Sequence, residues 1–541
     1  MPATDNIFQG QRLFDRTAAI LFLAAFAVRA LHIFFISQNS PFIDVLPGDL
    51  GAYHSWAKSI VSQGWIGKDI FYQDPLYPYF LAMVYTLIGE KFVLIYLLQA
   101  LLGAVTAAMI YLAGKQMFSK NTGLVSGTLF AFYAPAIFFD GLLLKVSLSA
   151  FLCMACFCLL IIFRGSKQQW RSLIGAGICF GLAVLTRANF LLLAPVIVAV
   201  LVFSDFRKIR KGVVSAVFFT AGTVMILFPV VLRNYYVSGS LVVTTAQAGQ
   251  NFFIGQNPRA TGTYIGLPFV RPDPLYERLD FQNEAQRRLG KTLSPPEVSQ
   301  YWFAQGMAFI RENPTAFLRL TWTKFRLFFN NYEMPDNHNF YFHKKYSHVL
   351  NLLPVSFYLV GPFFFVGMVA LFRERRFETN LLFYSQLAYI VSVLGFYVFS
   401  RYRMPVIPLF CLTAGYGTLS LLSNIKENKA LSAGIKLGAA AIILVWVSIP
   451  VFEPFNFGHS YVDEAIAYEL KNNPEKAVES YRQALEINPE YLRALERLGR
   501  LQLRLGAYGE AKKTYGKILE VRADSPEAKS VLFLISRKSG Q

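Results

Sequence analysis

The chain has 541 residues, of which 54% are hydrophobic and 16% are charged. A soluble globular protein carries about 25% charged residues, so long apolar runs between short basic clusters indicate an all-α integral membrane protein instead. The formal net charge is +19. Basic cytoplasmic loops beside an anionic leaflet explain this charge, and nucleic acid is not an expected partner.

Eleven apolar segments follow one another along the chain, and we predict that each is a transmembrane helix. The segments are residues 16–37, 92–114, 122–139, 142–163, 172–186, 189–203, 213–232, 352–372, 380–399, 405–422 and 433–450. No small-residue cleavage site follows the first segment, so we expect it to be retained and not removed as a signal peptide.

The stretch 74–90 is apolar but short for about 30 Å of hydrocarbon, and it opens with two prolines. If it does not cross and the N-terminus is cytoplasmic, every dense basic cluster lies inside, as the positive-inside rule requires. These clusters are Lys115/Lys120, Arg164/Lys167/Arg171, Arg207/Lys208/Arg210/Lys211, Arg373/Arg375/Arg376 and Lys426/Lys429. We therefore predict an outer interfacial helix at 74–90 and external loops at 38–91 and 233–351. The C-terminal segment then also emerges outside, which in a bacterium is the periplasmic side of the inner membrane.

The first external loop contains the sequence "GDLGAYHSWAKSIVSQG". It predicts a helix that starts after Asp49, with Asp49 as its N-cap. Tyr53 lies one turn further on, so both side chains could face one site. From these residues alone, Asp49 is either a helix cap or the general base of a reaction.

Asp140 lies at the next external boundary, in "FFDGLLLKVSL", with Lys145 slightly deeper. Carboxylates at membrane depth are costly and often mark function. Asp140 could therefore join Asp49 in orienting and deprotonating a hydroxyl nucleophile. The alternative is that Asp140 and Lys145 form a solvated or mutually paired boundary.

Four arginines stand at external ends of predicted spans, against the usual charge bias. They are Arg187, Arg233, Arg401 and Arg403. A guanidinium binds phosphate in a forked geometry, so these residues are candidate ligands for a phosphate or pyrophosphate. The alternative is that they reach lipid headgroups from the ends of their helices.

The second external loop, 233–351, has a soluble-like composition. Its stretch "GQNFFIGQNPRATGTY" mixes Asn, Gln, Gly and aromatic residues, so Asn251 and Asn257 are candidate substrate ligands, with plain turn chemistry as the alternative. Ser294 and Glu297 have capping-box spacing at the start of a predicted helix. The basic-aromatic stretch 314–329 predicts an amphipathic helix on the membrane surface. Glu333 and His338 are weaker catalytic candidates.

Residues 461–528 contain an internal repeat with a period of 34 residues. Ala477, Tyr481 and Ala484 recur as Ala511, Tyr515 and Ile518. This pattern of small and aromatic residues predicts tetratricopeptide helix pairs. Two units are few for a stable array, so the module could pack on the rest of the chain, dimerise or be completed by a protein partner.

The five cysteines all lie in apolar segments and are expected to be packing thiols, with no disulfide framework and no metal site. They are Cys153, Cys156, Cys158, Cys179 and Cys411. Nothing else in the sequence offers a clear set of metal ligands.

In order, several stretches of residues 12–450 resemble polytopic GT-C glycosyltransferases, the bacterial relatives of protein O-mannosyltransferases and lipid A aminoarabinose transferases. These stretches are "GDLGAYHSWA", "QDPLYPYFLAMVYTLIG", "FFDGLLLKVSLSAFL", "GLAVLTRANFLLLAP", "FPVVLRNYYVSGSLVVTTAQAGQNFFIGQNPRATGTY" and "RYRMPVIPLFCLTAGYG". The resemblance implies a GT-C bundle, for which we expect residues 1–454. The repeat and the charge bias together predict an external tetratricopeptide domain over 455–541.

The resemblance also implies a function: inverting transfer of a sugar from a polyprenyl-phosphate donor to an acceptor hydroxyl on the outer face. Asp49 matches the acid that activates the acceptor. Asp140 matches the region of a second acid, although many relatives have a glutamate where this chain has Lys145. The outward arginines would hold the donor phosphate, with Arg401 or Arg403 fitting best, and Tyr53 and Tyr402 would line the substrate site. Relatives generally need no cofactor and no divalent metal.

Three other functions fit parts of the sequence. An O-antigen ligase or polymerase-like transferase would use a lipid pyrophosphate and would not need an acid after the first span. A non-enzymatic anchor could display the repeats for envelope assembly, although eleven spans exceed what an anchor needs. A transporter is disfavoured because no predicted span carries paired charges. Protein hydroxyls, lipid A, a cell-wall polymer and a glycolipid all stay open as acceptors.

Overall fold

The computed structural model describes residues 15–538 except 166–167, 205, 272–273 and 453–455. Over these residues the chain forms helices and no β-strand, which confirms the predicted all-α fold class. It divides into two compact units. The first comprises Met1–Phe34, Gly48–Asp336 and His348–Val451, and the second comprises Phe35–Pro47, Asn337–Ser347 and Phe452–Gln541. The predicted domain boundary between residues 454 and 455 lies outside the described residues.

The helices follow the predicted apolar segments along the chain. Up to residue 238 they are α1 (Arg16–Asn39), α2 (Asp49–Gln63), α3 (Leu76–Ile88), α4 (Phe92–Met117), α5 (Lys120–Ala131), α6 (Ala134–Asp140), α7 (Val146–Ile162), α8 (Gln169–Thr186), α9 (Ala194–Phe203) and α10 (Ile209–Ser238). Beyond it they are α11 (Ala248–Gly255), α12 (Pro274–Leu289), α13 (Pro295–Glu312), α14 (Pro314–Phe328), α15 (Phe340–His343), α16 (His348–Leu352), α17 (Phe357–Arg373), α18 (Phe377–Leu394), α19 (Ser400–Arg403), α20 (Ile407–Lys426) and α21 (Ala430–Ser448). Short 3₁₀ helices are η1 (Pro41–Ile43), η2 (Phe163–Gly165), η3 (Ala188–Leu193), η4 (Phe206–Lys208), η5 (Lys344–Tyr346) and η6 (Met404–Val406).

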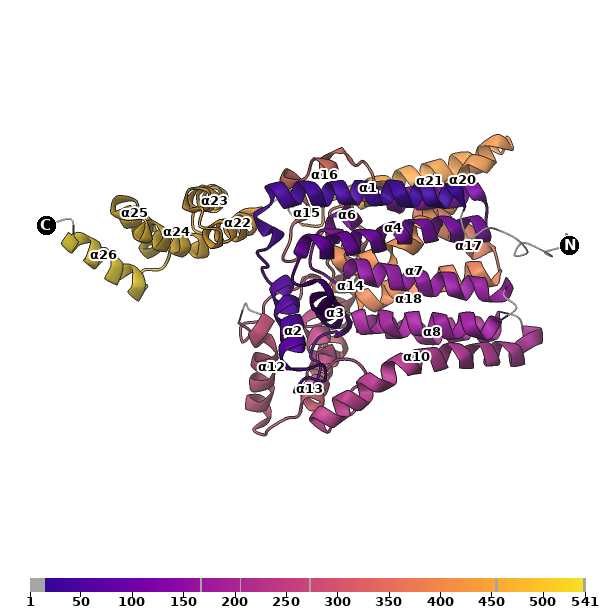
Figure 1. Cartoon of the computed structure of the whole chain (residues 1–541), viewed down its shortest axis with the longest axis horizontal. Coiled ribbons are helices and arrows are strands. Elements are labelled where there is room, and N and C mark those ends of the chain that lie inside the picture. The colour runs from indigo at the N-terminus through magenta and orange to yellow at the C-terminus, as the bar shows by residue number, and fades with distance from the viewer. Residues whose placement is uncertain (1–14, 166–167, 205, 272–273, 453–455, 539–541) are drawn as a thin grey trace. The chain divides into compact units, whose positions relative to one another are not determined.

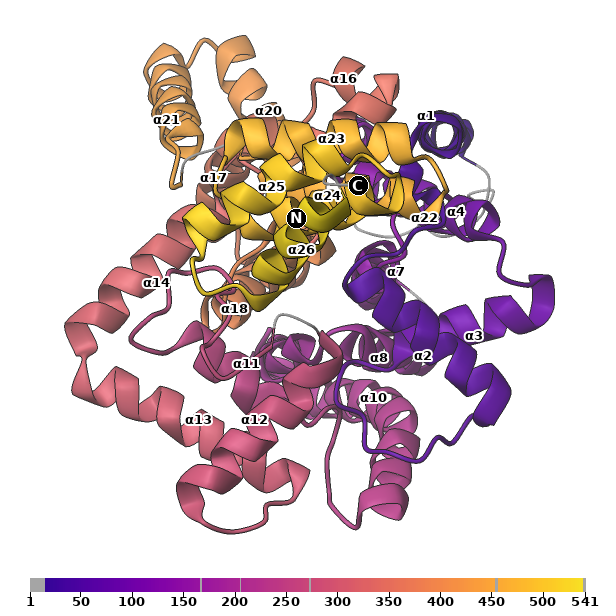
Figure 2. The ribbon, with the colours of Figure 1, turned by 90° about the vertical axis from the view of Figure 1, so that its left-hand side faces the viewer.

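Long apolar helices run side by side in the first unit. In Figure 1, α1, α4, α7, α8 and α10 lie next to one another, and α2 and α12 lie at one end of them. Helices α1, α8 and α10 run in one direction along this row, and α4 and α7 run in the opposite direction. The C-terminal ends of α1, α8 and α10 and the N-terminal ends of α4 and α7 therefore meet at the same end as α2 (Figure 2).

Six helical stretches among the described residues are long and apolar enough to cross a membrane. They are α1, α4, α8, α10, the stretch Ser400–Lys426 and α21. Shorter apolar helices include α3, α7 and α17. The chain is thus a multi-pass membrane protein, and the total of eleven spans stays a prediction.

Large apolar side chains cover the outer faces of these helices. On α10 the exposed residues include Val217 and Phe228, and on α21 they include Leu431, Ile435 and Ile442. A water-soluble surface rarely carries so many apolar side chains together. Such faces are typical of helices that are surrounded by lipid.

The predicted continuous span over 122–139 is wrong, because the helix breaks between α5 and α6. Tyr133 has an extended backbone, and Pro135 lies in the first turn of α6, where its missing N–H costs nothing. The carbonyl of Ala131 at the end of α5 accepts a hydrogen bond from Arg29 Nη1 at 2.7 Å. A side chain of α1 therefore satisfies the backbone at the break.

The second unit contains α22 (Gly458–Leu470), α23 (Pro474–Ile487), α24 (Leu492–Arg504), α25 (Tyr508–Val521) and α26 (Pro526–Lys538). Ala477 and Tyr481 are fully buried in one cluster, and Ala511 and Tyr515 are buried in the next. A Cβ at Gly499 would lie 2.8 Å from the ring of Tyr515. The small and aromatic residues of the repeat thus let helices approach, as predicted.

Candidate active site

Helix α2 places Asp49 in its first turn, beside the end of the helical row. The N-cap is Gly48, whose φ of 60° lies in the left-handed region that favours glycine. The prediction that Asp49 is the N-cap is therefore wrong, because the helix starts one residue earlier. As the first helical residue, the Asp49 carboxylate is available for a contact outside the helix.

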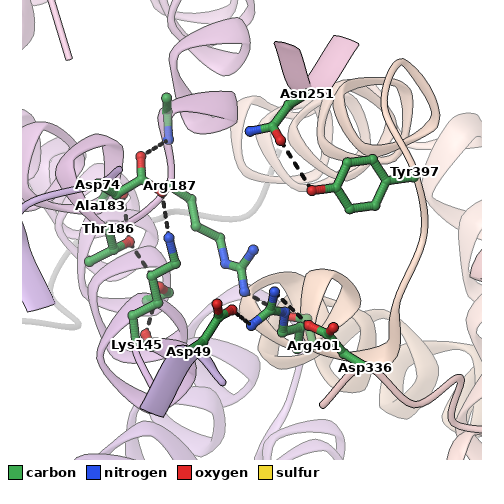
Figure 3. A network of polar contacts seen from close by, with 12 residues as sticks. Asp49, Asp74, Lys145, Ala183, Thr186, Arg187, Asn251, Asp336, Tyr397 and Arg401 are labelled. Carbon is green, nitrogen blue, oxygen red and sulfur yellow. Dashed lines mark hydrogen bonds and ion pairs between the residues drawn. The ribbon is translucent and has the colours of Figure 1, made fainter. Parts of the chain in front are cut away.

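That contact is Arg401, which also holds a second carboxylate. Arg401 Nη1 lies 2.5 Å from Asp49 Oδ2, and Arg401 Nη2 lies 2.5 Å from Asp336 Oδ2 (Figure 3). All three side chains are mostly buried. Charge-assisted bonds to a guanidinium are strong and directional, so α19, the first turn of α2 and the loop before α15 are fixed at one point.

Arg187, at the C-terminal end of α8, joins this cluster. Its Nη2 donates to the backbone carbonyl of Arg401 at 3.0 Å, and its guanidinium lies 4.8 Å from the centre of the Tyr402 ring. Only 7% of Arg187 is exposed. The Nε atoms of Arg187 and Arg401 are both buried, and neither has a hydrogen-bond acceptor among the described residues. The site therefore presents two buried cationic donors next to a carboxylate.

Lys145 supplies a third cation, held by Asp74. The Lys145 Nζ lies 2.5 Å from Asp74 Oδ2, and Asp74 Oδ1 accepts from the backbone N–H of Ala188 at 3.1 Å. Figure 3 shows this pair beside Asp49 and Arg187. Sequence reasoning missed Asp74, although it is the only charged residue between Asp69 and Glu90.

Tyr53 is buried beside the cluster. Its ring centre lies 5.9 Å from Lys145 Nζ and makes an edge contact with Tyr77 at 5.5 Å. Burial raises the pKa of Tyr53, and the neighbouring Asp49 carboxylate raises it further. Tyr53 therefore stays protonated at neutral pH.

Glu277 of α12 is a further acid near Asp49 that sequence reasoning missed. It accepts hydrogen bonds from the hydroxyls of Tyr72 at 3.2 Å and Tyr264 at 3.3 Å. Burial raises the pKa of Glu277, and Asp49 adds to this effect. The sequence of α12 does not reveal that Glu277 lies near Asp49, because an acid in the first turn of a helix is common.

The structure does not bring Asp140 into the Asp49 cluster. Asp140 Oδ2 lies 2.8 Å from Arg29 Nε, and Asp140 Oδ1 accepts from Ser147 Oγ at 2.5 Å. A Cβ at Gly103 would lie 2.6 Å from Arg29 Nε and 2.8 Å from Asp140 Oδ2. Arg29 is fully buried in α1, and a buried guanidinium needs a counter-ion. The carboxylate of Asp140 meets this need.

The other two predicted phosphate ligands, Arg403 and Arg233, have different partners. Arg403 Nη2 lies 2.6 Å from Glu333 Oε1, and its Nη1 donates to the carbonyls of Phe328 and Asn330. Arg233 Nε donates to the carbonyl of Ile66 at 2.7 Å. Arg187 and Arg401 are thus the predicted arginines that share one site.

The predicted polar ligands of the second external loop make different kinds of contact. Asn251 Oδ1 accepts from the hydroxyl of Tyr397 at 3.2 Å (Figure 3). Asn257 donates to the carbonyls of Phe253 and Ile254 and thereby closes the end of α11. Asn257 therefore stabilises the turn after α11, which was the alternative to substrate binding for this stretch. Tyr402 belongs to the cluster, because its ring lies beside both Arg187 and Arg401.

Among the residues that the structure describes, no group of three or more His, Cys, Asp or Glu side chains could hold a metal ion. All five cysteines are free thiols, as predicted. That the protein works without a metal or cofactor stays a prediction.

Comparison with known proteins identifies two segments of the chain. Residues 73–232 match the family model described as dolichyl-phosphate-mannose-protein mannosyltransferase. Residues 470–532 match the model of the tetratricopeptide repeat. None of the curated proteins compared with the chain matches it in sequence.

Solved structures give weaker similarities. The apo oligosaccharyltransferase of Archaeoglobus fulgidus is 14% identical, with a TM-score of 0.46 over 86% of this chain and 59% of its own length. ArnT from Cupriavidus metallidurans, bound to undecaprenyl phosphate, is 16% identical, with a TM-score of 0.45 over 96% of this chain and 76% of its own. This chain thus spans less than two thirds of the length of the archaeal enzyme.

The two family matches fall where the sequence predicts them. The first match covers the helices from α3 to α9 and most of α10, and it contains Asp74, Lys145 and Arg187. The second match covers the helices from α23 to α25 and the first part of α26. The predicted resemblance to GT-C glycosyltransferases of the protein mannosyltransferase type is therefore confirmed over residues 73–232, and the predicted tetratricopeptide repeats are confirmed over residues 470–532.

Proposed function

We propose that the protein is an inverting glycosyltransferase that moves a sugar from a polyprenyl-phosphate donor to an acceptor hydroxyl. The observation that carries the proposal is the pair of buried Nε donors on Arg187 and Arg401 beside the Asp49 carboxylate. Buried guanidinium donors without acceptors suit an anionic group such as a phosphate monoanion. The family match over residues 73–232 supports a lipid-linked phosphosugar as this anion.

In this proposal Asp49 is the general base. It takes the proton of the acceptor hydroxyl while the oxygen attacks the anomeric carbon of the sugar. The bond between that carbon and the phosphate oxygen breaks, and polyprenyl phosphate leaves with the bonding electron pair. Arg401 favours the ionised form of the neighbouring Asp49 carboxylate, as an adjacent cation does.

The cations of the cluster stabilise the leaving phosphate. Arg187 has no carboxylate partner among the contacts that the structure describes, so its charge is available for the donor. The ring of Tyr402 fixes the plane of this guanidinium. Lys145 adds a point charge that Asp74 holds in place. Fixed cations at the place where negative charge develops lower the barrier most.

The charge bias of the loops supports an external location for the reaction, the periplasmic side of the inner membrane in a bacterium. In this orientation the tetratricopeptide module is also external and could meet a protein partner or acceptor. The isoprenoid chain of the donor would lie in lipid next to the helical row.

The test measures turnover in membranes from a strain that lacks the gene and carries each variant on a plasmid, so the native acceptor is present. The probes are undecaprenyl phosphates that carry radiolabelled hexoses or pentoses, and the readout is release of undecaprenyl phosphate. Release that depends on the wild-type protein and on Asp49 supports the proposal. Transfer from undecaprenyl pyrophosphate donors alone would support the ligase-like alternative.

A further inference from the structure

Two short segments from outside the repeats complete the core of the tetratricopeptide unit. Phe35–Pro47 and Asn337–Ser347 belong to the same compact unit as the repeats. Phe42 and Phe342 form one buried apolar cluster with Ala467 of α22. Two repeats are fewer than a free-standing array needs. The two segments therefore supply the apolar packing that the first helix pair would otherwise receive from another repeat.

An ion pair with a buried carboxylate holds the segment Asn337–Ser347 against α22. Glu464 of α22 is 4% exposed, and its carboxylate lies 2.8 Å from Lys345 Nζ. It also accepts hydrogen bonds from the hydroxyls of Tyr346 and, at 3.1 Å, Ser480. Burial lowers the pKa of Lys345, and Glu464 opposes this shift. Removal of one member of such a pair leaves an uncompensated buried charge, so the contact strongly favours one geometry.

The other segment is held in two ways. Lys471 Nζ lies 2.7 Å from Asp44 Oδ1. The ring of Phe42 packs against the rings of His343 at 5.1 Å and His338 at 6.4 Å. The two segments are therefore fixed to each other as well as to the repeats.

Each segment continues directly into one of the two carboxylates on Arg401. Val45, which packs on the shared cluster, is four residues before Asp49. His338 is two residues after Asp336. At about 3.6 Å per residue, these links are at most about 14 Å and about 7 Å long. These links are short enough for a shift of the anchored residues to reach the carboxylates that bind Arg401.

We propose that Glu464 is a positioning residue for the transfer reaction. Through Lys345 and Tyr346 it fixes the two segments that lead into Asp49 and Asp336, and so it sets the distance between Asp49 and Arg401. The repeats then serve the reaction itself, in addition to any partner that they bind. This inference rests on the proposed function of Asp49 as the base.

The test compares Glu464→Gln and Lys345→Met with Glu527→Gln in the full-length protein. Glu527 pairs with Arg500 at 2.6 Å in the distal repeat and touches neither segment, so it is the matched control. A looser Asp49–Arg401 pair makes the carboxylate harder to ionise. We expect the acid limb of the pH profile of kcat/KM to move to higher pH by about half a unit or more. We also expect kcat to fall about 10-fold with little change in KM for the donor.

Glu464→Gln with an unchanged acid limb and kcat would overturn the inference. Should Glu464→Gln fail to fold, Lys471→Met changes an exposed contact of the other segment, and a shift in the same direction is expected. A fully wild-type profile for Lys471→Met and Lys345→Met would then overturn the inference. Asp49→Asn separates the two proposals. If Asp49→Asn still transfers the sugar, the proposed function fails. If Asp49→Asn is inactive and Glu464→Gln has a wild-type profile, only the positioning role is refuted.

Discussion

Asp49 and Arg401 form an ion pair of 2.5 Å between residues that are 352 positions apart in the chain. The pair joins the first turn of α2 to the helix that precedes α20. Because Arg401 also binds Asp336, one guanidinium joins its own helix α19 to the first turn of α2 and to the loop before α15. In the proposed function, the base and the donor phosphate meet at this point.

The first prediction concerns the base. Asp49→Asn keeps the size of the side chain but cannot accept a proton, so kcat should fall by about 10²- to 10⁴-fold. Binding of undecaprenyl phosphate should be retained, because Arg187 and Lys145 are unchanged. The control is Asp69→Asn, an exposed carboxylate of the same loop, which should transfer at the wild-type rate. Normal turnover by Asp49→Asn would show that Asp49 is not the general base.

The second prediction separates the predicted arginines. Arg187→Met should weaken undecaprenyl phosphate binding by about 10-fold or more, since a charge-assisted bond contributes about 1.5–3 kcal/mol. Arg233→Met should change binding little, because Arg233 holds the carbonyl of Ile66. Quenching of protein fluorescence by titrated undecaprenyl phosphate in detergent measures both affinities. Equal losses for the two variants would mean that the phosphate site is not at Arg187.

The third prediction concerns Asp140. Asp140→Asn leaves the fully buried Arg29 without its counter-ion and should cost about 3–5 kcal/mol of folding stability. Ser147→Ala removes only one hydrogen bond and should cost about 1 kcal/mol. Thermal unfolding in detergent ranks the variants. An Asp140→Asn protein that unfolds like the wild type but does not transfer would instead give Asp140 a catalytic role.

The fourth prediction is a pH dependence of stability. Lys324 donates to the carbonyl of Gly255 at 2.8 Å, and burial lowers the pKa of Lys324 to about 7 from its usual 10.5. Between these values the unfolded chain binds more protons than the folded one, so the free energy of unfolding rises with pH. The rise is at most about 1.4 kcal/mol per pH unit.

Thermal unfolding of wild type and Lys324→Met at pH 6.5, 8 and 9.5 isolates this effect. The wild-type protein should gain stability relative to Lys324→Met as pH rises. Parallel curves for the two proteins would show that the folded Lys324 has an ordinary pKa.

Charges at unusual places made part of the site predictable. Arg187 and Arg401 stand out because they are cationic residues at external ends of apolar segments, against the normal bias. Asp49 stands out as an acid at the start of a predicted helix in the first external loop. The repeat in the C-terminal module is equally visible, because its spacing reflects helix packing. These features depend on local sequence and on the order of the segments.

Pairing between distant residues was not predictable in the same way. Asp74 and Asp336 are ordinary loop acids until the fold places them on Lys145 and Arg401. The partner of Asp140 is an arginine inside the first apolar segment, 111 residues away. The residues at the break between α5 and α6 are as apolar as those on either side. A hydropathy average therefore does not reveal the break.

The most direct test of the account is an experimental structure of the protein with undecaprenyl phosphate. The account predicts a phosphate oxygen within about 3.2 Å of a guanidinium nitrogen of Arg187 or Arg401, with Asp49 beside the same site. A phosphate bound at Arg233 or Arg403, with Arg187 and Arg401 making no contact to it, would contradict the account.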